Sequence, residues 1–144
     1  MPQGPLIIRS DGSQHVGDTA DPSDWRLTLA PCDLTFIRVS HQARLQFDQV
    51  EVVIESRFTL DRGGIAFELD PNDRMGLGPF LAVYPASLTA ASIDGDGTLR
   101  LSFDTGDQIT VPPDPRYEPW QISGPGTALV VCQPGEVGTL AIWR

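Results

Sequence analysis

The chain has 144 residues, which is enough for one domain that folds around its own core without disulfides. Its formal net charge of −9 argues against nucleic acids and anionic membranes as partners and favours solubility or a basic protein partner. Every one of the 10 basic residues is arginine, aspartate far outnumbers glutamate, and glycine and proline are frequent, which together favour turns over helices.

The compartment is inferred from what the chain lacks. The first residues carry no basic flank, the run Leu6-Ile7-Ile8 is too short for the apolar segment of a signal peptide, and no apolar run is long enough to span a membrane. We therefore expect a cytoplasmic protein in which Cys32 and Cys132 are free thiols.

The first half of the chain shows strand patterns and one helix start. Residues 1–24 are predicted to form a short strand at Leu6–Arg9 and a polar arm. Further strands are predicted at residues 25–29, 34–39, 43–48, 50–55 and 65–69. Asp70 is a suitable helix cap and Pro71 a suitable first helical residue, so a short helix is expected within residues 70–85.

The second half is more regular. The sequence Asp94-Gly95-Asp96-Gly97 is a strong hairpin turn signal, and residues 104–107 form a second one. Strands are predicted at residues 88–93, 98–103, 108–111, 117–122, 128–132 and 140–143.

A short internal repeat suggests the architecture. Arg44-Leu45-Gln46-Phe47-Asp48 returns as Arg100-Leu101-Ser102-Phe103-Asp104, and a second strand-like run follows each copy. We predict a mainly β (α+β) fold in which two related antiparallel hairpin or meander units, at about 25–69 and 86–144, pack in one domain (residues 25–144). The short helix lies between them. A true duplication and two similar hairpins both remain compatible with this repeat.

Motifs that would indicate metal-dependent or aspartic-protease chemistry are incomplete. Asp104-Thr105-Gly106 matches the aspartic-protease triplet, but the first half has no copy of it and a hairpin turn explains it equally well. A calcium loop opening at Asp94 would need glycine at its sixth position and glutamate at its twelfth, where Leu99 and Thr105 stand.

The histidines and cysteines do not form a recognisable site either. His15 and His41 share no ligand spacing with Cys32 or Cys132, as a structural zinc site would require. Cys132 lies in an apolar run, where cysteine usually acts as a small hydrophobic residue. We therefore predict no metal, no cofactor and no catalytic residue.

The segment Asp114-Pro115-Arg116-Tyr117-Glu118-Pro119-Trp120 is the most distinctive part of the chain. Its acids and tyrosine could form a glycosidase-like or proton-transfer site. A proline-stiffened corner, in which Tyr117 and Trp120 stabilise the sheet, is the structural interpretation. If the corner is exposed, these two aromatic residues are of the types that anchor protein interfaces.

This segment also carries a family resemblance. Gly97-Thr98-Leu99 with Phe103 and Gly106, then the D-x-x-Y-E-x-W pattern at 114–120, Gly124, Pro134-Gly135 and Trp143 resemble a family of small, uncharacterised bacterial proteins that are common in actinobacteria. The likeness covers roughly residues 25–143. It departs from the pattern after Gly135, where a second glycine is replaced by a longer turn.

The resemblance and the charge together give a functional hypothesis. Similar small, acidic, sheet-rich bacterial proteins often serve as immunity partners of polymorphic toxins, so by analogy we expect an intracellular, non-enzymatic protein-binding module, immunity-like or regulatory, with a basic partner. The predicted partner-binding residues lie in turns of the second half: Asp94, Asp96, Asp104, Asp107, Asp114, Tyr117, Glu118 and Trp120. The alternatives are a small enzyme or ligand-binding domain with a pocket around Tyr117, Glu118 and Trp120, and a structural subunit that self-associates through a sheet edge.

Overall fold

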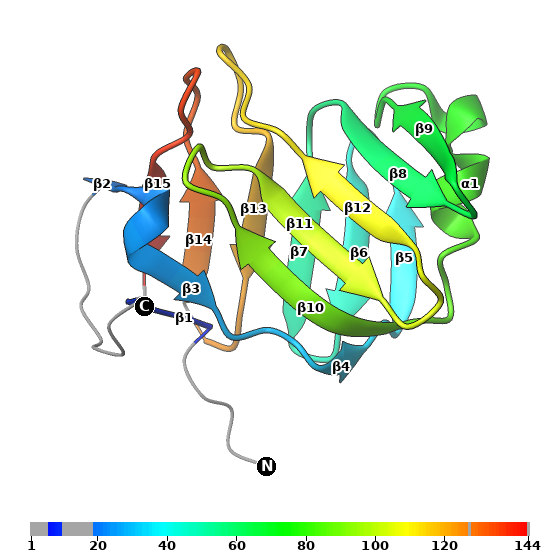
Figure 1. Ribbon diagram of the computed structural model, residues 1–144, viewed down its shortest axis with the longest axis horizontal. Coiled ribbons are helices and arrows are strands. Elements are labelled where there is room, and N and C mark those ends of the chain that lie inside the picture. The colour runs from blue at the N-terminus through cyan, green and yellow to red at the C-terminus, as the bar shows by residue number, and fades with distance from the viewer. Residues whose placement is uncertain (1–5, 10–18, 127, 144) are drawn as a thin grey trace.

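A computed structural model describes residues 6–9, 19–126 and 128–143. Two antiparallel sheets face each other and enclose one apolar core (Figure 1), which confirms the predicted mainly β fold. The six-stranded sheet has the order β4 (Cys32–Asp33), β10 (Ser87–Ile93), β11 (Leu99–Phe103), β12 (Gln108–Val111), β8 (Phe58–Arg62) and β9 (Ile65–Leu69).

The seven-stranded sheet lies behind it in the view of Figure 1. Its order is β2 (Thr19–Ala20), β15 (Leu140–Trp143), β14 (Leu129–Cys132), β13 (Trp120–Ser123), β7 (Val50–Ile54), β6 (Ala43–Phe47) and β5 (Phe36–Val39). A separate pair, β1 (Ile7–Arg9) with β3 (Trp25–Leu27), adds buried apolar residues to the same core.

The two copies of the sequence repeat meet inside the molecule. In β6 and in β11 alternate residues face inward, and Leu45 and Leu101 at equivalent positions are both fully buried. Phe47 and Phe103, which are also equivalent, stack with their ring centroids 6.4 Å apart and an interplanar angle of 20°. The repeat therefore marks the strands whose side chains hold the two sheets together.

The topology extends the repeat well beyond five residues. The meander β5–β6–β7 lies in one sheet and the meander β10–β11–β12 in the other. The hairpin after each meander crosses to the opposite sheet, where β8 pairs with β12 and β13 pairs with β7. Each half thus contributes to both sheets, so the predicted units do not correspond to one sheet each.

The segment between the halves differs in detail from the expectation. Asp70 accepts a hydrogen bond from the Asn72 amide at 2.9 Å and so closes a turn. Helical structure begins only with the 3-10 turn Arg74–Leu77, capped by Asp73, and continues as the single-turn helix α1 (Gly78–Leu81). Two glycines and a proline within these residues disfavour a longer helix. A second 3-10 turn spans Pro22–Asp24.

One contact joins the sheets at the end that carries the β10–β11 turn. Trp120 is fully buried, and its Nε1–H donates to the Gly97 carbonyl oxygen at 2.9 Å. Gly97 has φ +95°, and a Cβ built there would lie 2.5 Å from the Gly138 carbonyl oxygen. The Gly138 amide in turn donates to the Asp96 carbonyl oxygen at 2.8 Å. Only glycine at position 97 allows this approach of the β10–β11 turn to the β14–β15 loop.

We expect Gly97→Ala to lower the free energy of unfolding by about 3 kcal/mol, since it combines a left-handed backbone with a steric overlap. Gly95→Ala is the matched control in the same turn, because a Cβ there meets nothing closer than Ser23 Cβ at 3.9 Å. Urea unfolding followed by tryptophan fluorescence would measure both variants. Equal stabilities of the two would contradict the close approach.

We expect Trp120→Ala to cost about 3–5 kcal/mol, the usual range for removing a buried tryptophan. Trp120→Phe should cost less, since it keeps apolar volume and loses the hydrogen bond to Gly97. Trp143→Ala provides the comparison, because Trp143 is 52% exposed and should change stability by less than about 1 kcal/mol. Thermal unfolding of the three variants would rank them, and an unchanged melting temperature for Trp120→Ala would show that Trp120 does not support the core.

Candidate functional site

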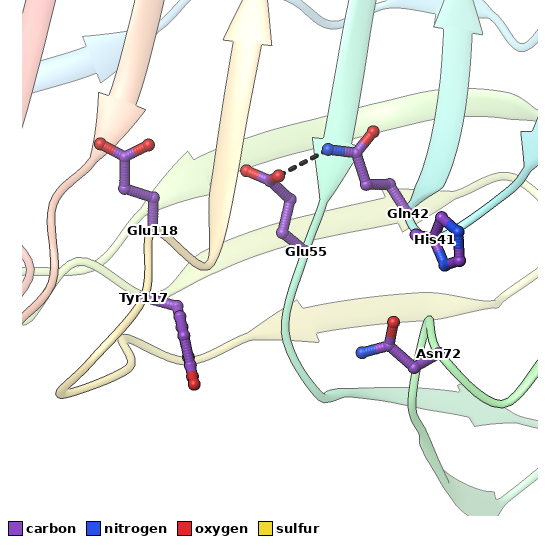
Figure 2. A pocket seen from close by; sticks show the side chains of 6 residues that line it. All are labelled: His41, Gln42, Glu55, Asn72, Tyr117 and Glu118. Atoms are coloured by element: carbon purple, nitrogen blue, oxygen red, sulfur yellow. Dashed lines mark hydrogen bonds between the residues drawn. The ribbon is translucent and has the colours of Figure 1, made fainter.

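A concave surface of the molecule lies where the chain crosses between the sheets. This groove has a volume of about 590 Å³, and its six lining residues are shown in Figure 2: His41, Gln42, Glu55, Asn72, Tyr117 and Glu118. A smaller depression of about 280 Å³ adjoins it and shares Glu55, Asn72 and Tyr117. The two together form one surface, which we call the crossover groove.

The crossover groove exists because the two halves of the fold differ at this point. The first crossover, from β7 to β8, consists only of Glu55, Ser56 and Arg57. The corresponding crossover from β12 to β13 is much longer and runs from residue 112 to residue 119. The extra length builds one wall of the groove, whereas the β5–β6 turn and the turn after β9 supply the others.

Three hydrogen bonds from backbone amides fix the shape of the longer crossover. Asp114 Oδ1 accepts hydrogen bonds from the amides of Arg116 at 2.8 Å and Tyr117 at 3.0 Å. The Glu55 amide donates to the Pro119 carbonyl oxygen at 2.8 Å and so ties the two crossovers together. Tyr117 is held at the surface with 64% of its area exposed. The segment therefore forms the predicted proline-stiffened corner, but the prediction that Tyr117 stabilises the sheet is wrong, because its side chain points outward and only Trp120 is buried.

The groove is acidic. Glu55 and Glu118 both line it, and in the view of Figure 2 Glu55 lies between Glu118 and Gln42, with Tyr117 beneath Glu118. Asp70 and Asp114 line the adjoining depression, where Arg57 is the basic lining residue. Arg57 is largely exposed and its Nε lies 3.7 Å from Asp70 Oδ2, a weak contact in high dielectric. The groove therefore carries an excess of negative charge.

Three of the eight predicted partner-binding residues line this surface: Asp114, Tyr117 and Glu118. Trp120 follows them directly in sequence but is buried in the core, so it cannot contact a partner in this structure. The four remaining aspartates lie in two separate turns at opposite ends of β11. The acids of the second half thus do not form one cluster.

In the turn before β11, the two aspartates have internal partners. Asp94 Oδ2 accepts a hydrogen bond from Arg100 Nε at 2.7 Å. Asp96 Oδ1 accepts one from the Thr98 amide at 2.9 Å, and this bond holds the pKa of Asp96 below its usual value, with a smaller contribution from nearby Arg100. Both carboxylates therefore stabilise the hairpin turn.

The turn after β11 explains the aspartic-protease-like triplet structurally. Asp104 Oδ1 accepts a hydrogen bond from the Ser87 amide at 3.0 Å. Asp107 is buried, and its Oδ2 accepts hydrogen bonds from Arg62 Nη1 at 2.8 Å and from Thr105 Oγ1 at 2.7 Å. A buried carboxylate with both of these partners fixes the turn to the end of β8.

Four groove residues were absent from the predicted binding set: His41, Gln42, Glu55 and Asn72. They come from three segments that are far from residues 114–118 in sequence, and pairing of β7 with β13 brings them together. Glu55, a charged residue at the end of an apolar strand, is the one sequence signal that could have indicated this site.

The two cysteine thiols are weakly acidic in the folded protein. Burial, together with the charges of Asp96 and Glu118, raises the pKa of Cys132 to about 12, and burial with nearby Asp33 raises that of Cys32 to about 11.

The described residues contain no group of three or more His, Cys, Asp or Glu side chains arranged to hold a metal ion. In the same part of the chain, none of the helices combines the length and apolar character needed to cross a membrane.

The raised thiol pKa values make a direct prediction about reactivity. At pH 8, alkylation of Cys132 and Cys32 by iodoacetamide in the folded protein should be at least about a hundredfold slower than in urea, because the thiolate is the reactive form. The thiols stay neutral when folded, so stability should be retained below the unfolded thiol pKa of about 8.5 and should fall as pH rises above it. Mass spectrometry of the alkylated peptides would measure both rates. Rapid labelling of Cys132 in the folded state would contradict its raised pKa.

Comparison with known proteins gives one result. The model of a Family of unknown function (DUF6188) matches residues 25–144, close to the range over which the sequence resembles an uncharacterised family. Curated proteins and solved structures gave no match. On the evidence of that family model, the chain belongs to the family of unknown function DUF6188.

Proposed function

We propose that this protein is a non-enzymatic protein-binding module, immunity-like or regulatory, whose crossover groove accepts a basic side chain of its partner. The observation that supports the proposal is that Glu55 and Glu118 line one groove together with the exposed ring of Tyr117. An arginine or lysine entering between the two carboxylates would form charge-assisted hydrogen bonds with either of them. The tyrosine ring offers that cation a stacking surface.

The charge of the whole chain supports the same type of partner. With a net charge of −9, the protein attracts a basic protein over a longer range than the groove itself. The groove can hold only part of an interface, so a partner would also contact the surrounding loops. Binding through this surface should weaken with salt, because the groove is open to solvent and its charges are screened.

We expect the tagged protein to capture one stoichiometric basic partner from an extract of its source organism. The double variant Glu55→Gln/Glu118→Gln should capture at least about tenfold less of this partner than the wild type, because two charge-assisted hydrogen bonds are lost. Asp48→Asn/Asp104→Asn is the matched control. It removes the same charge at two repeat-equivalent positions, which precede β7 and β12 and therefore lie at the strand ends opposite the groove. Quantitative mass spectrometry at low and moderate salt would read out the experiment. Equal losses in both double variants would indicate general electrostatic attraction, and full capture by the groove variant would exclude this site.

The same groove supports a second candidate, a small cationic ligand in place of a protein partner. The volume of about 590 Å³ falls within the usual range of small-molecule sites, and Tyr117 and Glu118 both line it, as the enzyme or ligand-binding alternative expects. Trp120 has no part in such a pocket because it is buried. A thermal-shift screen of cationic metabolites would favour this candidate if a compound stabilised the wild type but not Glu118→Gln.

A further inference from the structure

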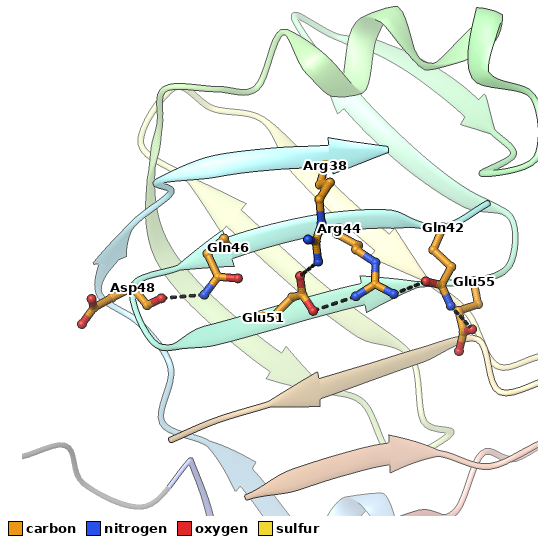
Figure 3. Close-up of polar contacts among 7 residues, drawn as sticks. All are labelled: Arg38, Gln42, Arg44, Gln46, Asp48, Glu51 and Glu55. Atoms are coloured by element: carbon orange, nitrogen blue, oxygen red, sulfur yellow. Dashed lines mark hydrogen bonds and ion pairs between the residues drawn. The ribbon is translucent and has the colours of Figure 1, made fainter. Parts of the chain in front are cut away.

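A chain of polar side chains leads from the outer face of the seven-stranded sheet into the crossover groove (Figure 3). Arg38 Nη2 donates to Glu51 Oε2 at 3.0 Å, and Arg44 Nη1 donates to Glu51 Oε1 at 2.8 Å. Arg44 Nη2 also donates to Gln42 Oε1, and Gln42 Nε2 donates to Glu55 Oε1. Donors and acceptors alternate through all five residues.

The alternation fixes the orientation of the Gln42 amide. A guanidinium can only donate, so the Gln42 atom that faces Arg44 has to be the oxygen. The amide nitrogen is then directed at Glu55, whose Oε1 accepts its hydrogen bond. A free glutamine amide could rotate and present either atom, whereas this one is held by a charged neighbour that is itself held by Glu51.

Glu55 lies outside the regular sheet, so its side chain needs another group to orient it. It directly follows the last residue of β7, where the chain turns toward β8. Oε1 of Glu55 accepts the hydrogen bond from Gln42, whereas Oε2 has no hydrogen-bond partner among the described residues. Glu55 is thereby presented with one oxygen held and the other available to a ligand in the groove.

We infer that Arg44 is a positioning residue for Glu55: acting through Gln42, it holds that carboxylate in the orientation in which the groove accepts a guanidinium or ammonium group. This inference rests on the proposed function and specifies how one half of the binding site is built. Arg44 is three-quarters buried and itself contacts Glu51 and Gln42, so its role is exerted from outside the groove.

The internal repeat provides a control at the equivalent residue. Arg100 occupies in β11 the place of Arg44 in β6, but its Nε donates to Asp94 Oδ2 in the turn at 2.7 Å, and it has no link to the groove. Arg44→Met and Arg100→Met remove the same charge and keep a similar aliphatic stem. By general electrostatics, loss of either cation should strengthen binding of a cationic probe, so weakening by Arg44→Met alone would be specific to positioning.

The test uses a blocked peptide of alternating glycine and arginine, with its citrulline counterpart as the uncharged control, titrated into the full chain at low salt. We expect Arg44→Met to bind the arginine peptide about fivefold more weakly than the wild type, as for the loss of one oriented hydrogen bond, whereas Arg100→Met binds at least as tightly. Gln42→Met, which breaks the chain at another link, should weaken binding similarly. Because Arg44 acts through Glu55, Arg44→Met should not weaken binding any further in a Glu55→Gln background, where only the general electrostatic effect of losing the cation remains.

A readout that does not depend on binding separates the two proposals. Hydrogen exchange of the Gln42 side-chain amide, followed by NMR, should be slow in the wild type and in Arg100→Met and fast in Arg44→Met. Failure of the wild type to bind the arginine peptide, with the amide still protected through Arg44, would overturn the basic-side-chain function and leave the orientation of Glu55 intact. Binding that is lost in Glu55→Gln but unchanged in Arg44→Met would overturn the positioning role alone. The positioning role would also be overturned if Arg44→Met weakened binding of the arginine peptide equally in the wild-type and the Glu55→Gln backgrounds.

Discussion

The hydrogen bond from the Trp120 indole to the Gly97 carbonyl is the contact that fixes how the two sheets meet at the end that carries the β10–β11 turn. A buried indole N–H without an acceptor would be costly, so the β10–β11 turn has to approach β13 closely enough to provide one. That approach is possible because the turn residue is glycine, since a Cβ at position 97 would lie 2.5 Å from the Gly138 carbonyl oxygen. One polar group in the core therefore requires glycine at position 97, in a turn that belongs to the opposite sheet.

The same contact determines where the crossover groove lies. Trp120 is the first residue of β13, so anchoring it fixes the end of the long crossover that begins after β12. The other side of the groove is fixed by β7, which pairs with β13 and ends immediately before Glu55. The groove thus lies between two segments whose ends are held by the sheet.

The exchange of hairpins between the sheets explains why this region differs from the rest of the fold. The meanders β5–β6–β7 and β10–β11–β12 correspond, down to the stacked pair Phe47 and Phe103, and the packing of these buried side chains leaves little space for variation. The crossovers are loops that join the sheets, and they can differ in length without changing either meander. One crossover is minimal and the other carries Asp114, Tyr117 and Glu118, so the groove lies where the two crossovers differ in length.

Sequence patterns predicted the mainly β fold and the related halves because alternation of apolar and polar residues is a local property. They missed β8, although Phe58 and Leu60 alternate with polar residues ahead of the Gly63-Gly64 turn. The exchange of hairpins and the groove could not be predicted in this way, since they depend on which distant strands pair. For the same reason the sequence grouped Trp120 with Tyr117 and Glu118, although strand β13 begins between them and directs the tryptophan into the core.

The hydrogen-bond partners of the aspartates show which acidic residues of this β protein are available for binding. Asp96 and Asp107 accept hydrogen bonds from neighbouring backbone or side-chain groups, and those bonds stabilise the turns in which they lie. A partner that competed for either carboxylate would have to break a bond that supports the fold. Glu55 directly follows β7 and Glu118 lies two residues before β13, and in the longer crossover the carboxylate that closes the turn is that of Asp114 rather than Glu118. Density of acidic residues along the sequence is therefore a poor guide to a binding surface, whereas a carboxylate that is oriented from one side and open on the other, as Glu55 is by Gln42, meets the physical requirement for one.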